Sequence, residues 1–214
     1  MSAAESIDRH ALLAQASSPR QATTADAQAL SKLLARAFLS DPVIDWIARA
    51  GTRRERGLEK FFHWILTERA LPFGEVWMAG GVVAVWVPPG APASPGGFWE
   101  QLLLLPMFVK LCGFARMRRG EAMGAAMEKH HPQAPHFYLA FIGVEPRLQG
   151  LGLGSAMLEA NIQRIDAQGA PAYLENSNPK NTRLYERLGF KLGANIAPAT
   201  APPLMAMWRE GKPE

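Results

Sequence analysis

A strand, a glycine-rich turn and a helix follow one another between residues 142 and 165, and this succession constrains the fold more than any other feature. From Ile142 to Ser155 the chain reads Ile-Gly-Val-Glu-Pro-Arg-Leu-Gln-Gly-Leu-Gly-Leu-Gly-Ser. Leu158, Ile162 and Ile165 then recur at the spacing of one helix face. The pattern predicts a buried strand that turns sharply into an amphipathic helix.

Three glycines at alternate positions, Gly150, Gly152 and Gly154, make this turn suited to an anion. Glycine admits backbone conformations in which successive N–H groups point into one concavity, and the start of a helix adds about half a positive charge. Glycine also costs about 1 kcal/mol wherever it falls inside a helix, which argues against a turn without a ligand. We therefore predict a phosphate or diphosphate site for a nucleotide-like ligand.

Two better-known phosphate motifs do not fit this turn. A triphosphate-binding loop ends in Gly-Lys-Ser/Thr, but Ser155 follows Gly154 directly and the next lysine is Lys180. In a dinucleotide-binding turn, the third glycine follows the second by three residues. This position holds Met157 if Gly154 is taken as the second glycine, and Ser155 if Gly152 is. Glu175 lies about 20 residues on at a strand end, as the ribose-binding acid of that motif does, so a nucleotide-dependent oxidoreductase stays an alternative.

The rest of the chain predicts a mixed sheet covered by helices. Thr23 and Asp26 form a helix-capping pattern before an apolar stripe, and Gly80-Gly81 joins two Val- and Trp-rich runs as a hairpin would. A hairpin followed by a strand-helix-strand crossover indicates an α/β or α+β fold. We expect helices at 30–38, 44–47, 54–70, 98–130 with breaks near Pro106 and Gly113, 152–167 and 179–188, and strands at 75–78, 82–87, 136–144, 171–175, 190–196 and 204–208.

The length of 214 residues favours one large domain over two, since a domain takes roughly 150 residues. Apart from Leu12 and Leu13, residues 1–19 are small and polar, and they end in Ser17-Ser18-Pro19, so we expect a flexible tail there and a single domain over 20–214. Within it, residues 88–135 begin with a proline- and glycine-rich loop and continue as a helical insert.

Composition narrows the function classes. Apolar residues make up 48% and charged residues 20% of the chain, as in globular proteins, and the net charge of +4 does not indicate nucleic-acid binding. The longest apolar run, 102–109, is much shorter than the ~20 residues of a membrane-spanning helix. Cys112 is the only cysteine, which excludes an intrachain disulfide and suits a reducing compartment. With no secretory signal visible at its start, we expect a soluble cytoplasmic protein.

In the segment from Ile142 to Ser155, the sequence resembles the GNAT acetyltransferase superfamily. The signature of that family is Gln or Arg, two residues, Gly, one residue, then Gly or Ala, which Gln149, Gly152 and Gly154 match after Val144-x-Pro146. The similarity spans roughly residues 20 to 209 and includes a second block: Leu174-Glu175-Asn176, Asn178-Pro179, Asn181, Tyr185-Glu186-Arg187 and Gly189-Phe190.

The resemblance implies a mostly antiparallel sheet of six or seven strands, with helices on both faces and a splay between the fourth and fifth strands. It also implies transfer of the acetyl group from acetyl-CoA directly to a primary amine in a ternary complex, without a metal. Cys112 then need not be a nucleophile. A non-catalytic acetyl-CoA-binding sensor with the same fold is the alternative.

The resemblance also assigns the cofactor site. The splay would leave unpaired backbone groups near Ile142 to Val144, with which the amides of the pantetheine arm would pair as a missing strand does. The N–H of Val144 is the candidate to polarise the thioester carbonyl. The expected cofactor-binding residues are Ile142, Val144, Gln149, Gly150, Leu151, Gly152, Leu153, Gly154, Ser155, Asn181 and Tyr185.

The reaction requires two proton-handling groups. Tyr185 matches the general acid of the family, which assists the leaving thiolate. An amine of pKa about 10.4 must lose a proton before it attacks, and Glu175 is our candidate base, with a water chain from His136 or Tyr138 as the alternative. The acceptor is a small-molecule or peptide amine that the sequence does not identify, and residues 88–135 are a candidate wall of its site. Neither a nucleic acid nor a membrane is expected as a partner, and a homodimer is left open.

Overall fold

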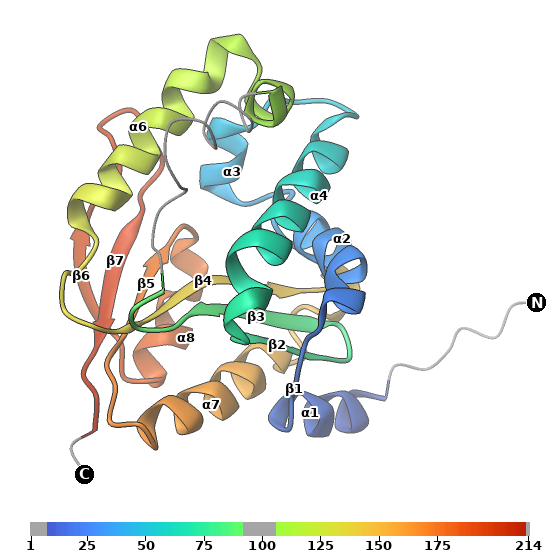
Figure 1. The fold of residues 1–214 in the computed structure, drawn as a ribbon, viewed down its shortest axis with the longest axis vertical. Coiled ribbons are helices and arrows are strands. Elements are labelled where there is room, and N and C mark those ends of the chain that lie inside the picture. The colour runs from blue at the N-terminus through green and yellow to red at the C-terminus, as the bar shows by residue number, and fades with distance from the viewer. Residues whose placement is uncertain (1–7, 92–105, 213–214) are drawn as a thin grey trace, which may run out of the picture.

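The computed structural model describes residues 8–91 and 106–212. Its strands are β1 Arg20–Gln21, β2 Val76–Ala79, β3 Val82–Val87, β4 Phe137–Val144, β5 Ala172–Asn176, β6 Lys191–Asn195 and β7 Met205–Arg209. They form one open sheet in the order β1-β2-β3-β4-β5-β7-β6 (Figure 1). Neighbouring strands are antiparallel except β4 and β5, which are parallel. The predicted fold class is confirmed.

Helices cover both faces of this sheet (Figure 1). They are α1 Arg9–Ser17, α2 Ala27–Ala37, α3 Pro42–Ile47, α4 Arg54–Trp64, α6 Phe114–His130, α7 Leu153–Asp166 and α8 Thr182–Arg187, and residues 106–112 are also helical. Helices α1 and α7 pack on one face, against β2, β3 and β4, and α2 packs on the other. Helix α6 contacts α3 and reaches the connection between β6 and β7. Among the described residues, no helix is long and apolar enough to cross a membrane.

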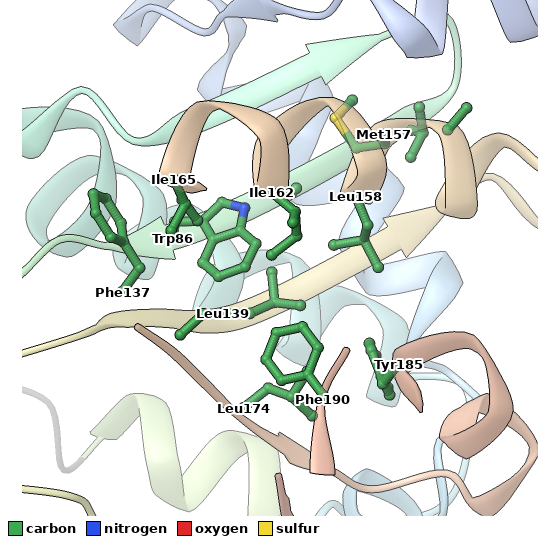
Figure 2. Packing of buried hydrophobic residues seen from close by; sticks show 14 of the residues in the cluster. Trp86, Phe137, Leu139, Met157, Leu158, Ile162, Ile165, Leu174, Tyr185 and Phe190 are labelled. Atoms are coloured by element: carbon green, nitrogen blue, oxygen red, sulfur yellow. The ribbon is translucent and has the colours of Figure 1, made fainter. Parts of the chain in front are cut away.

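Strand β3 is buried on both sides and forms the centre of the core. Val82, Ala84 and Trp86 point toward α7, whereas Val83 and Val85 point toward α2 and α4. This alternation follows from the two-residue period of a strand. Figure 2 shows Trp86 beneath α7, beside Ile162 and Ile165. The position of β4 is thereby set, because it pairs with β3 along its length.

Local sequence signals account for most element boundaries. Thr23 and Asp26 form the predicted capping box before α2, and the hairpin joining β2 and β3 turns at Gly80-Gly81 as expected, with Gly81 in the left-handed region. Gly113 breaks the predicted long helix before α6. The expected helix 54–70 continues from α4 as a π-helix, Ile65–Ala70. The part of the predicted helix over 98–105 lies outside the described residues.

The expected flexible tail is wrong for residues 9–17, which form α1. The carboxylate of Asp8 caps this helix by accepting from the N–H groups of His10 and Ala11. Leu12, Leu13 and Ala16 attach it to the core, and Ala16 is fully buried. The short segment has a weak amphipathic pattern, so its helical state depends on contacts that the sequence alone does not reveal.

The core under α7 offers a direct test of this packing. Leu158 is fully buried, so Leu158→Ala should lower the free energy of unfolding by about 2–5 kcal/mol, because it removes apolar contacts and leaves a cavity. Chemical denaturation would measure this change. Leu192→Ala is the control, since Leu192 is 50% exposed, and equal effects of the two variants would contradict the assigned core.

Candidate active site

Strands β4 and β5 part shortly after they meet. Phe137–Leu139 pair with Ala172–Leu174, and in the described structure the ladder between the two strands ends there. Strand β4 continues to Val144 and β5 to Asn176, so a gap opens between them. On the other side of β4, its residues Phe141 and Leu139 pair with Val85 and Trp86 of β3. Ala140 lies between them without a partner, and this bulge bends β4. The predicted splay is confirmed.

Backbone groups of β4 face this gap. The N–H of Glu145 donates to the carbonyl of Gly81 in the turn before β3. Because backbone groups alternate in direction along a strand, the N–H and C=O groups of Val144 and Ile142 point the other way, toward the gap. In agreement, the carbonyl of Val144 accepts a hydrogen bond from the side-chain amide of Gln149 at 3.1 Å.

The glycine turn lies at the end of β4 and carries N–H groups of its own. Gly150 and Gly152 have φ angles of 81° and 94°, which favour glycine strongly. Gly152 is the N-cap of α7, and the N–H groups of Leu153 and Gly154 have no carbonyl partner within that helix. Apart from Gly150 and its two chain neighbours, no described residue has a heavy atom within 4 Å of the place where a β-carbon on Gly150 would stand, so the turn is open on that side.

Gln149 is one of the expected cofactor-binding residues. Its backbone N–H already donates to the carbonyl of Pro146 at 3.3 Å, so it is not a free donor for a phosphate. The reason is the single 3-10 turn Pro146–Leu148, which tightens the chain before the glycines. The side chain instead bonds to Val144, and Gln149 therefore holds the end of β4 against the turn.

Tyr185 projects from α8 into the core on the α7 face of the sheet. Only 6% of it is exposed, and its ring lies 6.2 Å from that of Phe190. Figure 2 shows the two residues in the same buried cluster. Burial, and secondarily the negative charge of Asp41, raise the pKa of the Tyr185 hydroxyl well above its ordinary value. The hydroxyl therefore stays protonated and can act as a hydrogen-bond donor. Asn181, four residues earlier, is exposed.

Glu175 lies on the other face, one residue beyond the part of β5 that pairs with β4. Its carboxylate accepts hydrogen bonds from the hydroxyls of Tyr138, at 2.7 Å, and Tyr173, at 3.3 Å. Burial raises the pKa of the Glu175 carboxyl, and the two hydrogen bonds oppose that shift in part. Leu174 packs in the same core as Tyr185, so alternation along β5 places Glu175 and Tyr185 on opposite faces of the sheet.

Histidine rings lie beside the two tyrosines that donate hydrogen bonds to Glu175. The ring of His131 lies 5.1 Å from that of Tyr138, and the ring of His136 lies 5.5 Å from that of Tyr173. Nδ1 of His136 is 2.7 Å from the carbonyl of Ala134, and its buried Nε2 has no hydrogen-bond partner among the described residues. Burial, with a smaller contribution from His136, lowers the pKa of His131.

Sequence reasoning missed two members of this site. Tyr173 was detectable, because it alternates with Leu174 and so shares a face with Glu175. Asp41 was not among the expected site residues. Its carboxylate caps α3 by accepting from the N–H groups of Val43 and Ile44, and it also accepts a hydrogen bond from the hydroxyl of Ser177. This link joins the start of α3 to the end of β5.

Two other candidate features have structural roles. Cys112 is buried, and burial raises the pKa of its thiol, so it is a poor nucleophile. Arg116 and Arg119 hydrogen-bond to carbonyls of Ala48 and Trp46, which attaches α6 to α3. Among the described residues, no group of three or more His, Cys, Asp or Glu side chains is arranged to hold a metal ion.

Comparison with known proteins identifies the architecture. Residues 86–190, which include β4, the glycine turn, α7, β5 and α8, match the model of the acetyltransferase (GNAT) family. This chain belongs to that family. The match contains both blocks on which the resemblance in the sequence was based.

Curated relatives match only in part. Mycothiol acetyltransferase of Streptomyces avermitilis is 35% identical over 88 residues, which are 40% of this chain and 29% of that protein. The enzyme of the same name from Paenarthrobacter aurescens is 40% identical over 78 residues, or 33% of this chain and 24% of that protein. The chain thus spans less than a third of the length of these relatives.

Solved structures share the fold over nearly the whole chain. A histone acetyltransferase and related acetyltransferase from Corynebacterium glutamicum has a TM-score of 0.67 at 24% identity, covering 92% of this chain and 97% of that one. The C-terminal condensation domain of Ebony, in complex with beta-alanyl-dopamine, has a TM-score of 0.61 at 11% identity, covering 90% of this chain and 97% of that one. At these identities the likeness shows the fold.

The hydrogen bonds to Glu175 can be tested by titration. Tyr138→Phe removes a donor that favours the charged carboxylate, so the pKa of Glu175 should rise further above its ordinary value. The measurement is the pH dependence of the Glu175 carboxyl carbon shift by NMR. Tyr185→Phe, on the opposite face, should leave this titration unchanged. A fall of the Glu175 pKa in Tyr138→Phe would contradict the arrangement.

Proposed function

We propose that this GNAT family member is an N-acetyltransferase that moves the acetyl group of acetyl-CoA directly to a primary amine, in a complex of enzyme and both substrates. One observation carries the proposal: the glycine turn and its N–H groups lie at the end of β4, next to a gap in the sheet that has Tyr185 on one face and Glu175 on the other.

The residues at the gap fit coenzyme A. N–H groups between Gly150 and Ser155, together with the positive end of α7, would bind its diphosphate. The outward-facing backbone groups of Ile142 and Val144 match the amides of a pantetheine arm, and the N–H of Val144 would polarise the thioester carbonyl. Asn181, exposed at the start of α8, would hold the same arm. Acetyl-CoA supplies the activated acetyl group, and the protein provides position and charge.

Glu175 would take the proton of the attacking amine. A free amine has a pKa of about 10.4, so at neutral pH it is protonated and cannot attack. The raised pKa of the Glu175 carboxyl makes it a better proton acceptor than an exposed carboxylate. Its negative charge among tyrosine and histidine rings also suits a cationic amine that approaches from the face opposite the cofactor. This arrangement supports an amine acceptor without identifying one.

Tyr185 would stabilise the thiolate that leaves. A thiol has a pKa of about 8.5, below that of any tyrosine, and burial raises the pKa of Tyr185 further. A donor of that kind favours a hydrogen bond to the thiolate over complete proton transfer. Its contribution is therefore made in the transition state, where negative charge grows on sulfur.

Thiol release from acetyl-CoA tests the proposal. The purified protein should release free thiol with at least one member of a panel of small amines and amine-bearing peptides. Tyr185→Phe should lower kcat by roughly 10- to 100-fold and leave the Kd for acetyl-CoA within about twofold, since the hydroxyl acts on developing charge.

Two outcomes would contradict this account. An equal loss of turnover and of cofactor affinity in Tyr185→Phe would remove Tyr185 from the acid role. Cofactor binding without thiol release across the panel would favour a sensor of acetyl-CoA.

Glu175→Gln separates chemistry from stability. The variant should lose about 100-fold in kcat because the base is gone. It should also unfold at a higher temperature than wild type at pH 8. A folded-state pKa above the unfolded value gives stability that is complete below the unfolded pKa and lost as pH rises through the folded pKa. Near pH 4 the gain should disappear.

Calorimetry at both pH values measures the difference, with the exposed acid Glu159→Gln as control. A Glu175→Gln variant less stable than wild type at pH 8 would show that the carboxylate serves structure, not catalysis.

A further inference from the structure

The N-terminal helix lies directly against the glycine turn. Nε of Arg9, in the first turn of α1, donates to the carbonyl of Leu151 at 3.1 Å. Leu13 Cδ2 lies 3.4 Å from the place where a β-carbon on Gly152 would stand, and Nη2 of Arg9 lies 4.0 Å from it. Helices α1 and α7 run side by side in this region (Figure 1). A segment that precedes the sheet therefore contacts the turn from outside the two sequence blocks that identify the family.

This placement of Arg9 gathers positive charge. The N-terminus of α7 carries the positive end of the helix dipole, where a cation is unfavourable unless an anion is also present. The first turn of α7 contains no acidic residue. Glu145, before the turn, is paired with Arg36 at 2.6 Å. In residues 8–91 and 106–212, Arg9 forms no ion pair.

Arg9 is held where it is by the packing of α1. Asp8, the residue before Arg9, caps α1, and Ala16, near the other end of the helix, is fully buried. The bond from Nε to Leu151 uses one donor of the guanidinium, and neither Nη group donates a hydrogen bond to another described residue. A side chain with a fixed backbone and free donors, next to a turn of outward N–H groups, has the properties of an anion ligand.

We propose that Arg9 binds a phosphate of coenzyme A, so that α1 forms one wall of the cofactor site. The inference rests on the proposed function, because it takes coenzyme A as the ligand of the turn. Coenzyme A carries a diphosphate and a 3′-phosphate, and a guanidinium donates two parallel hydrogen bonds to either. Both sources share one chemistry, and dephospho-coenzyme A, which lacks the 3′-phosphate, distinguishes them.

Calorimetric titration of the full chain tests the proposal. Arg9→Gln should weaken coenzyme A binding about three- to tenfold at low salt, and the loss should shrink as salt screens the pair. Arg20→Gln is the matched control, because it removes an exposed arginine that pairs with Asp26 away from the turn. A loss that disappears with dephospho-coenzyme A assigns the contact to the 3′-phosphate. A loss that persists assigns it to the diphosphate.

Failure of the inference about Arg9 and failure of the proposed function would give different results. If wild type binds coenzyme A and Arg9→Gln binds it equally well, the inference is overturned and the proposed function stands. A loss that is the same at low and high salt would show that Arg9 only holds the Leu151 carbonyl, and would also overturn it. If wild type does not bind coenzyme A at all, the proposed function itself fails.

Discussion

The rest of the site depends on the early end of the ladder between β4 and β5. Three residues pair, the bulge at Ala140 bends β4, and the backbone groups of Ile142 and Val144 then face a gap. A buried backbone donor without a partner costs about 1–3 kcal/mol, so such a gap is stable only where water or a ligand satisfies it. A ligand arm that contains amides meets that requirement. The sheet is thus incomplete at the position where the chain has concentrated its glycines.

Because successive side chains of a strand point to opposite faces of the sheet, different side chains lie on the two sides of this gap. Leu174 faces the core that contains Tyr185, and Glu175 faces the rings of Tyr138 and Tyr173. Under the proposed function, the donor for the leaving thiolate and the acceptor for the amine proton would therefore lie on opposite faces of one sheet. The hydrogen bond between Asp41 and Ser177 links α3 to the end of β5 beside them. Acetyl-CoA and the amine would therefore approach from opposite faces of the sheet and meet at the gap.

Local sequence signals predicted the features that depend on nearby residues. Glycine spacing, the capping box at Thr23 and the Gly80-Gly81 hairpin each act over a few residues, and the structure agrees with them. The features missed depend on contacts between distant segments. Helix α1 looked like a tail because its apolar face is short. The bond from the Gln149 N–H to Pro146 is local, but it belongs to a 3-10 turn that has no strong sequence signal. The pairing of Tyr138 with Glu175 needed the register between β4 and β5.

The central claim is that main-chain N–H groups of the turn and of β4 bind coenzyme A. Amide NMR of the labelled protein during titration with acetyl-CoA addresses it residue by residue. We expect large shifts and slowed hydrogen exchange for Gly150, Gly152, Gly154 and Val144, whereas Gly81, in the turn between β2 and β3, should stay unchanged. Saturable binding with shifts confined to other parts of the chain would contradict the claim.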